Sequence, residues 1–230
     1  MKKHGIFYLF VALFALLLCC LSFSGRLQYA LALSIGAAVV FCLLFFITFE
    51  QKKPGLQDLM PIVVVCTIAS VGRIAFSFVP QVQPVTVLVI LTGVAFGARS
   101  GFVTGALTAL ISNMVLSQGP WTPWQMLAWG MVGLISGGLA KIKWCRSLWV
   151  MSAWSFLAAF LYSLITDIWT VASLGAAVNA PMVWTIFGAG LAFNVGHAVG
   201  NVALMLVLFL PVTKAFERIQ TKYGVLLNRE

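Results

Sequence analysis

The stretch NMVLSQGPWTPWQ, residues 113–125, lies between two strongly apolar segments and determines how they connect. It contains a Gly-Pro pair ending at Pro120 and a second proline, Pro123. Proline lacks an N–H donor and interrupts helices, so the stretch predicts a short, stiff loop. Trp121 and Trp124 stand where a membrane protein places amphipathic rings, at the level of the lipid headgroups. Two interpretations stay open here: an aromatic belt beside a tight turn, or a rigid aromatic lip over a ligand pocket.

The composition is that of a membrane protein. Of 230 residues, 62% are hydrophobic and 8% are charged, whereas charged residues make up about a quarter of a typical soluble domain. The apolar runs are continuous and longer than the ~10-residue alternating segments of a membrane β-barrel. We therefore expect an all-α polytopic membrane protein. The five cysteines show no CxxC or Cys/His spacing and are interpreted as small hydrophobic side chains, without a disulfide frame or a metal site.

Apolar segments long enough for helices recur along the chain. Crossing about 30 Å of hydrocarbon takes about 20 helical residues. We predict eight segments, at 6–22, 28–49, 58–79, 84–97, 101–117, 121–140, 147–172 and 184–212. The first also has the form of a signal peptide but lacks a clear cleavage pattern, so we favour a retained helix. The fourth and fifth are short. They leave a re-entrant hairpin open as an alternative. That hairpin would place Arg99 deep in the bilayer at a cost of ~2.5–3.5 kcal/mol, so we favour two full crossings with Arg99 at the inner surface.

A charged gap divides the predicted helices into two groups. We predict an N-terminal transmembrane hairpin (1–49), a linker (50–57), a six-helix core (58–212) and a basic tail (213–230). With the N-terminus in the cytoplasm, all of the 14 basic residues except Arg26 and Arg73 fall in inside loops or the tail. The positive-inside rule therefore predicts a multi-pass protein of the cell (plasma) membrane with both termini cytoplasmic. The net charge of +9 is explained by this topology and by anionic lipid in the bilayer, so no nucleic-acid partner is expected.

Ionisable residues inside a membrane are costly and usually face a cavity or a partner. The sequence has three such residues in the outer half of the predicted core: Arg73, Asp167 and His197. Uncharged polar side chains gather at a similar depth, namely Gln81, Gln83, Asn113, Gln118, Gln125, Tyr162, Thr166, Thr170 and Asn194. We therefore predict a polar, aromatic-rimmed cavity open to the outside. An ion pair between Arg73 and Asp167, and a His197 that is hydrogen-bonded to a neighbouring helix, are the simpler structural alternatives.

Catalytic motifs are weak in this sequence. It has no Gly-x-Ser-x-Gly, His-Glu-x-x-His or P-loop pattern. We therefore expect no enzyme and no cofactor, and a transporter built from this chain would be passive or driven by other subunits. Small residues four apart predict close helix contacts, at Gly101/Gly105/Ala109, Gly133/Gly137 and Ala192/Gly196/Gly200.

Residues 58–212 resemble the substrate-binding S components of energy-coupling factor (ECF) vitamin transporters. The supporting stretches are GRIAFSFVPQVQPVTVLVILTGVAFGARSGFVTGALTALISN (72–113) and SQGPWTPWQMLAWGMVGLISGGLAK (117–141). Within the family these stretches are most similar to the cobalamin-type S components, and WTPWQ is their most specific part. The resemblance implies a six-helix core that binds a vitamin on its outer face. It also implies a membrane T subunit and two cytoplasmic ATPase subunits as partners.

The resemblance, together with the polar groups, gives a set of candidate substrate-binding residues: Arg73, Gln81, Gln83, Asn113, Trp121, Trp124, Gln125, Asp167, Asn194 and His197. The two tryptophans would stack on or cover the vitamin, and Arg73 would meet an anionic or carbonyl group. The family often docks its T subunit through an Ala-x-x-x-Ala pair on the first core helix. Cys66 and Ser70 are the nearest equivalents here. Two rival functions are a ligand-free structural or assembly protein, and a proton-coupled carrier that uses Asp167 and His197.

Overall fold

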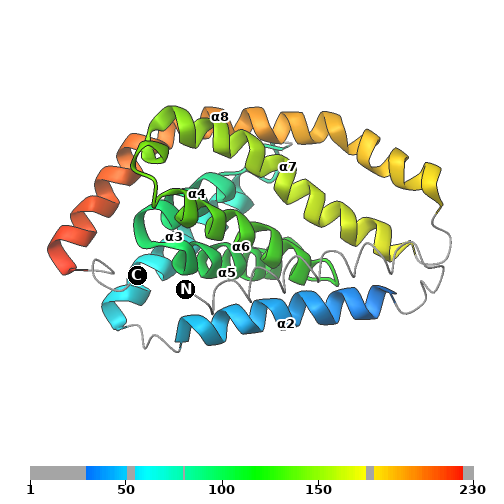
Figure 1. The fold of residues 1–230 in the computed structure, drawn as a ribbon, viewed down its shortest axis with the longest axis horizontal. Helices are drawn as coiled ribbons and strands as arrows, with labels where there is room; N and C mark the ends of the chain where they lie inside the picture. The colour runs from blue at the N-terminus through cyan, green and yellow to red at the C-terminus, as the bar shows by residue number, and fades with distance from the viewer. Residues whose placement is uncertain (1–29, 51–54, 80, 175–178, 225–230) are drawn as a thin grey trace.

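The computed structural model describes residues 30–50, 55–79, 81–174 and 179–224. This part of the chain contains α-helices, one short 3-10 helix and no strand (Figure 1). The helices are α2 (Ala30–Glu50), α3 (Leu56–Ala75), α4 (Val85–Phe96), α5 (Ala98–Leu116), α6 (Thr122–Leu139), η2 (Lys143–Arg146), α7 (Leu148–Ser173) and α8 (Ala180–Tyr223). The predicted all-α class is confirmed. The first predicted segment, 6–22, lies outside the described residues.

Six of the predicted segments match their helices to within four residues at each end, because local breakers set these boundaries. Helix α5 ends at Leu116, and the next residue, Ser117, has a φ of 144° that leaves the helical region. Helix α6 then begins at Thr122 with Pro123 in its first turn, where proline is tolerated. The predicted loop between these two helices is therefore confirmed.

The last helix differs from its prediction. It begins four residues earlier, where the side chain of Asn179 accepts a hydrogen bond from the backbone N–H of Met182 at 2.9 Å and caps the first turn. It also passes Pro211 and ends at Tyr223 rather than at residue 212. The first part of the predicted tail, 213–223, is therefore a continuation of α8.

Three of the described helices are long and apolar enough to cross a membrane, within Asp58–Ala75, Leu148–Ser173 and Ala180–Tyr223. Helix α4 has 12 residues and spans about 18 Å at 1.5 Å per residue, so by itself it does not cover the hydrocarbon thickness. A single residue, Gly97 with a φ of 91°, separates α4 from α5. Glycine adopts this conformation without a steric penalty.

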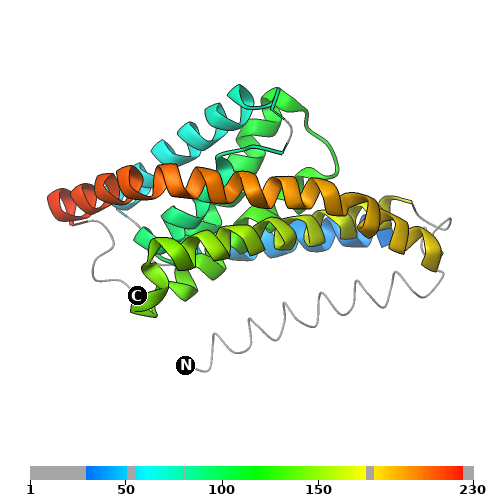
Figure 2. The same cartoon turned by 90° about the horizontal axis from the view of Figure 1, so that it is seen from above.

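The core helices pack most closely where α5 meets α6. A methyl group on Gly133 would lie 2.2 Å from the carbonyl oxygen of Gly101, and one on Gly105 would lie 2.4 Å from that of Trp129. The contact predicted from Gly101/Gly105 and Gly133/Gly137 is confirmed. Gly196 and Gly200 instead face the segment at Gln81 and Val82. Helices α7 and α8 lie side by side, as Figures 1 and 2 show.

Helix α2 lies against the side of the bundle formed by α5 and α6 (Figure 1). Aromatic side chains make this contact. The ring of Phe45 stacks on that of Phe102 in α5, with 3.8 Å between centroids and 18° between planes, and Phe41 lies next to both. The predicted N-terminal hairpin therefore has at least its second helix packed on the core.

Candidate functional site

Arg73, near the C-terminal end of α3, is the centre of a polar network. Its side chain is 7% exposed. The Nη1 atom donates hydrogen bonds to Oγ of Ser112 and to Oδ1 of Asn113, both at 2.6 Å. The guanidinium carbon lies 4.8 Å from the ring centroid of Trp129 on α6, which is within the range of a cation–π interaction. The arginine is therefore held by neutral groups on two other helices.

Asn113 connects this arginine to the loop that follows α5. While its Oδ1 accepts from Arg73, its Nδ2 donates to Oε1 of Gln125 at 2.8 Å and to Oγ1 of Thr122 at 3.0 Å. The hydroxyl of Thr122 donates to Oε1 of Gln118 at 2.9 Å. One buried amide thus determines the position of the loop, of the first turn of α6 and of the buried cation.

Trp129 extends the network to the remaining core helices. Its indole N–H donates to Oγ1 of Thr86 on α4 at 3.2 Å, and that hydroxyl shares a hydrogen bond of 3.3 Å with Nε2 of His197 on α8. The ring of Tyr162 on α7 lies 4.6 Å from Trp129 and 5.7 Å from His197, the latter edge-on. Each of the six core helices therefore contributes a side chain to one connected network.

The charge of Arg73 is the main electrostatic feature of this network. Moving a cation out of water is expensive unless an anion or several hydrogen bonds compensate it. The hydrogen-bond partners of Arg73 are the neutral side chains of Ser112 and Asn113, and its Nε has no hydrogen-bond partner among the described residues. Among the structural alternatives above, the predicted pair with Asp167 is therefore not formed. Such a site favours a ligand that brings an anionic or strongly electronegative group.

Two predicted site residues lie away from the network. Trp124 is 1% exposed and packs in an apolar cluster with Phe41, Phe45 and Phe102, so its ring supports α2 and α5. Trp121 is 36% exposed. A methyl group on Gly119 would lie 2.3 Å from its ring, so the indole of Trp121 covers that glycine and stiffens the loop.

Asp167 and Asn194 form a separate pair of polar side chains between α7 and α8. Both border Gly190, because a methyl group there would lie 3.8 Å from Oδ2 of Asp167 and 3.6 Å from Nδ2 of Asn194. Asn194 also accepts a hydrogen bond of 2.6 Å from Ser163. The side chain of His197 bonds to Thr86 and not to Asp167, so these described residues do not form the direct proton relay of the carrier hypothesis.

Two of the predicted glutamines, Gln81 and Gln83, lie in the segment between α3 and α4, and both are partly buried. Gln81 has a φ of 64°, which few residues other than glycine adopt. Its side chain lies beside Gly196, one residue before His197. Gln81 therefore borders the α8 end of the network.

The predicted docking residues face the interior of the bundle. Cys66 is 1% exposed and Ser70 is 3% exposed, and the thiol of Cys66 lies 3.5 Å from the carbonyl oxygen of Thr104 on α5. Their side chains therefore pack within the core. The exposed face of α3 instead carries larger apolar residues, including Met60, Val64 and Ile68.

Sequence reasoning missed four members of the network: Thr86, Ser112, Thr122 and Trp129. A signal for Trp129 was present, because it lies four residues after Gln125 and thus one helical turn away on the same face. Ser112 and Thr86 had no such signal. Serine and threonine are common in membrane helices, where they often bond their own backbone, as Ser112 also does to Thr108 at 2.6 Å.

Comparison with known proteins identifies the family to which the chain belongs. Residues 59–217, well over half of the chain, match the model of the ECF-type riboflavin transporter, S component. No curated protein and no solved structure showed a significant match. The matched segment runs from α3 into the last turns of α8 and includes every residue of the Arg73 network, whereas α2 lies outside it. The chain belongs to the family of the ECF-type riboflavin transporter S component and is a membrane protein.

Proposed function

We propose that this chain is the substrate-capture subunit of an ATP-driven ECF vitamin transporter. The observation that carries the proposal is a buried arginine with no anionic partner among the described residues. It belongs to a network to which all six helices of the family-matched core contribute. A T subunit and two ATPase subunits would supply the energy, because this chain has no nucleotide-binding motif. With both termini in the cytoplasm, the network and the loop at 113–125 would face the outside.

The ligand would lie against the outer side of the network. Arg73 would meet its anionic or carbonyl group. Asn113, Gln125, Gln81 and Gln83 would offer hydrogen bonds to its polar edge. Asp167, Asn194 and His197 would border the site from the side of α7 and α8. Trp121 would cover the loop. Trp124 would not contact the ligand and would instead hold the first turn of α6 in position through its apolar contacts.

Two observations favour different vitamins as the ligand. The matching family model is described by riboflavin, whereas the WTPWQ stretch resembles the cobalamin-type S components. We propose riboflavin as the first candidate, because the family match covers the whole network. Cobalamin or a related corrinoid is the second candidate, supported by the sequence resemblance.

The T subunit would dock on the core through the exposed apolar residues of α3. This proposal replaces the pair Cys66 and Ser70, whose side chains are buried. Met60, Val64 and Ile68 are at least half exposed in this chain. They would offer the partner a continuous apolar face.

A ligand-stability screen tests the proposed capture function. Purified protein would be heated with riboflavin, cobalamin and other B vitamins in turn. A ligand that binds the folded state stabilises it by about 2.7 kcal/mol at a hundred times its Kd, so the right vitamin raises Tm. Arg73→Gln removes a buried cation whose hydrogen-bond partners Ser112 and Asn113 are neutral, so the fold is expected to persist while the ligand-induced rise in Tm shrinks strongly.

The control is Lys141→Gln, which removes an exposed positive charge from the segment between α6 and α7 and is expected to keep the full rise. If no vitamin raises Tm, or if Arg73→Gln binds the vitamin as tightly as the wild type, the assignment of this network as the ligand site is wrong.

A further inference from the structure

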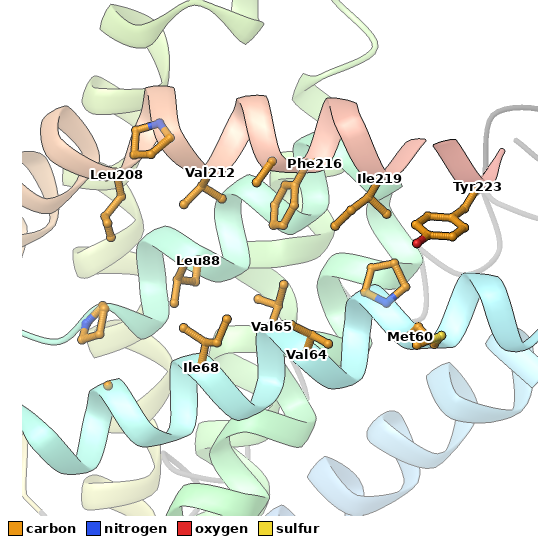
Figure 3. A pocket seen from close by; sticks show the side chains of 15 residues that line it. Met60, Val64, Val65, Ile68, Leu88, Leu208, Val212, Phe216, Ile219 and Tyr223 are labelled. Carbon is orange, nitrogen blue, oxygen red and sulfur yellow. The ribbon is translucent and has the colours of Figure 1, made fainter. Parts of the chain in front are cut away.

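A second feature lies away from the Arg73 network, on the side of the bundle between α3 and α8. The two helices form the walls of a groove of about 600 Å³, with Leu88 of α4 at its floor (Figure 3). Val64 and Ile68 line the α3 wall, and Val212 and Ile219 line the α8 wall. The lining residues are apolar except for the hydroxyl of Tyr223 at one end, so the groove offers almost nothing to a polar ligand.

The groove is a fixed part of the fold. The ring of Phe216 packs against Phe96 at the end of α4, with 4.9 Å between centroids. The side-chain amide of Gln220 donates to the carbonyl oxygen of Ala95. These contacts hold the last turns of α8 against α4 and keep them apart from α3, so the groove does not depend on a mobile segment.

The groove is longer than the hydrocarbon thickness of one leaflet of a bilayer. Its α8 wall runs from Leu208 to Tyr223, which is about 22 Å at 1.5 Å per residue. Half of the hydrocarbon thickness is about 15 Å. An acyl chain of one leaflet therefore fits along the groove, with its headgroup end near the last turns of α8.

Basic residues run from the middle of the α8 wall to this end of the groove. Lys214, Arg218 and Lys222 are exposed and spaced by four on α8, so they lie along one face of the helix. Each immediately precedes a groove-lining residue, Ala215, Ile219 or Tyr223. The ammonium group of Lys222 lies 5.2 Å from the ring centroid of Tyr223, which places a positive charge at the end of the apolar wall.

We propose that this groove binds an anionic phospholipid. Its acyl chain lies between α3 and α8, and its phosphate is held by Lys214, Arg218 and Lys222. Juxtamembrane basic residues attract anionic lipid, and each contributes about a fivefold gain in affinity. The proposal goes beyond vitamin capture, because it concerns a different face of the molecule from the Arg73 network and needs no vitamin. The α3 wall of the groove is also the surface proposed above for the T subunit, so the lipid would occupy the groove while that subunit is not docked.

Lipid retention tests it. The full chain is taken from vesicles that contain equal amounts of phosphatidylglycerol and phosphatidylcholine with the same acyl chains, and bound lipid is counted by native mass spectrometry. The wild type is expected to retain phosphatidylglycerol preferentially. In the triple variant K214Q/R218Q/K222Q, the ratio of retained phosphatidylglycerol to phosphatidylcholine is expected to fall at least tenfold. The matched control K141Q/K143Q neutralises exposed charges away from the groove and keeps the preference.

A groove-filling change tests the acyl-chain part. Val64 is half exposed, so Val64→Phe fills the groove without disturbing the core, and it is expected to reduce retention of both lipids. Ala215→Phe fills the groove from the opposite wall and serves as the second variant. Equal retention of the two lipids by the wild type would overturn the proposal. Groove-filling variants that retain as much lipid as the wild type would also overturn it, because the acyl chain would then not lie in the groove.

Discussion

At the scale of single residues, Asn113 determines how the buried cation and the loop fit together. Its amide is 2% exposed and bonds Arg73 through the oxygen, and Thr122 and Gln125 through the nitrogen. No other natural side chain of this size offers an acceptor and two donors at once. The position therefore tolerates few substitutions.

We expect Asn113→Leu to destabilise the protein strongly, because a buried polar group left without its partner costs about 1–3 kcal/mol and three groups lose theirs. Asn113→Asp keeps an acceptor for Arg73 and turns that bond into a charge-assisted one, which is stronger. The aspartate has no N–H for Thr122 and Gln125, so its Tm is expected to lie between that of Asn113→Leu and that of the wild type. Thermal unfolding in detergent measures the Tm of both variants. Equal losses for the two variants would show that the contact with Arg73 contributes little to stability.

At the scale of elements, the glycines between α5 and α6 decide how closely these helices approach. Lipid tails are as apolar as the helices, so association in a membrane depends on close packing. The backbone of Gly101 lies so near Gly133 that no side chain fits between them. The same approach brings the backbone of Trp129 to Gly105 and so sets the depth of the indole that joins the network.

Gly133→Ala is therefore expected to destabilise the bundle by about 1–3 kcal/mol, the usual cost of overpacking. Gly138, on the same helix, has open space around it. Gly138→Ala is expected to be neutral or to stabilise by about 0.5–1 kcal/mol, since alanine loses less backbone entropy in a helix. Equilibrium unfolding of the two variants compares them directly, and a Gly133→Ala variant as stable as the wild type would contradict the close contact.

At the scale of the whole molecule, α2 is an addition to the segment that matches the family. It packs on the core through Phe41 and Phe45, in the same cluster as Trp124. Trp124 belongs to the first turns of α6, directly after the loop that Asn113 holds. Helix α2 therefore supports the candidate site from behind.

We expect Phe45→Ala to loosen this support and to speed hydrogen exchange in residues 121–127. The loss of stability should be smaller than the about 3–5 kcal/mol of a water-soluble core, because lipid tails replace part of the lost contact. Leu43→Ala changes an exposed residue of the same helix and is the matched control. Identical exchange in both variants would mean that α2 does not position α6.

Much of the fold follows from local properties of the sequence. Apolar runs of sufficient length predicted the helices, and proline and glycine predicted the loop between 117 and 121, where the structure ends α5 at Leu116 and begins α6 at Thr122. The cost of an ionisable group in lipid was enough to single out Arg73 and His197 from the sequence. Asn113 and Gln125 were identified by polarity at a similar depth, and the fold brings both into contact with the network.

The tertiary structure decided which face of each helix turns inward. In a membrane both the lipid-facing and the core-facing residues are apolar, so hydrophobic periodicity does not separate them. For this reason the sequence could not tell that Trp124 packs behind the site, that Cys66 and Ser70 are buried, or that Trp129 contacts Arg73, Thr86 and Tyr162. Element boundaries are local and were determined by the sequence itself, whereas the partners of Arg73 depend on contacts between segments about 40 residues apart and were determined only by the fold.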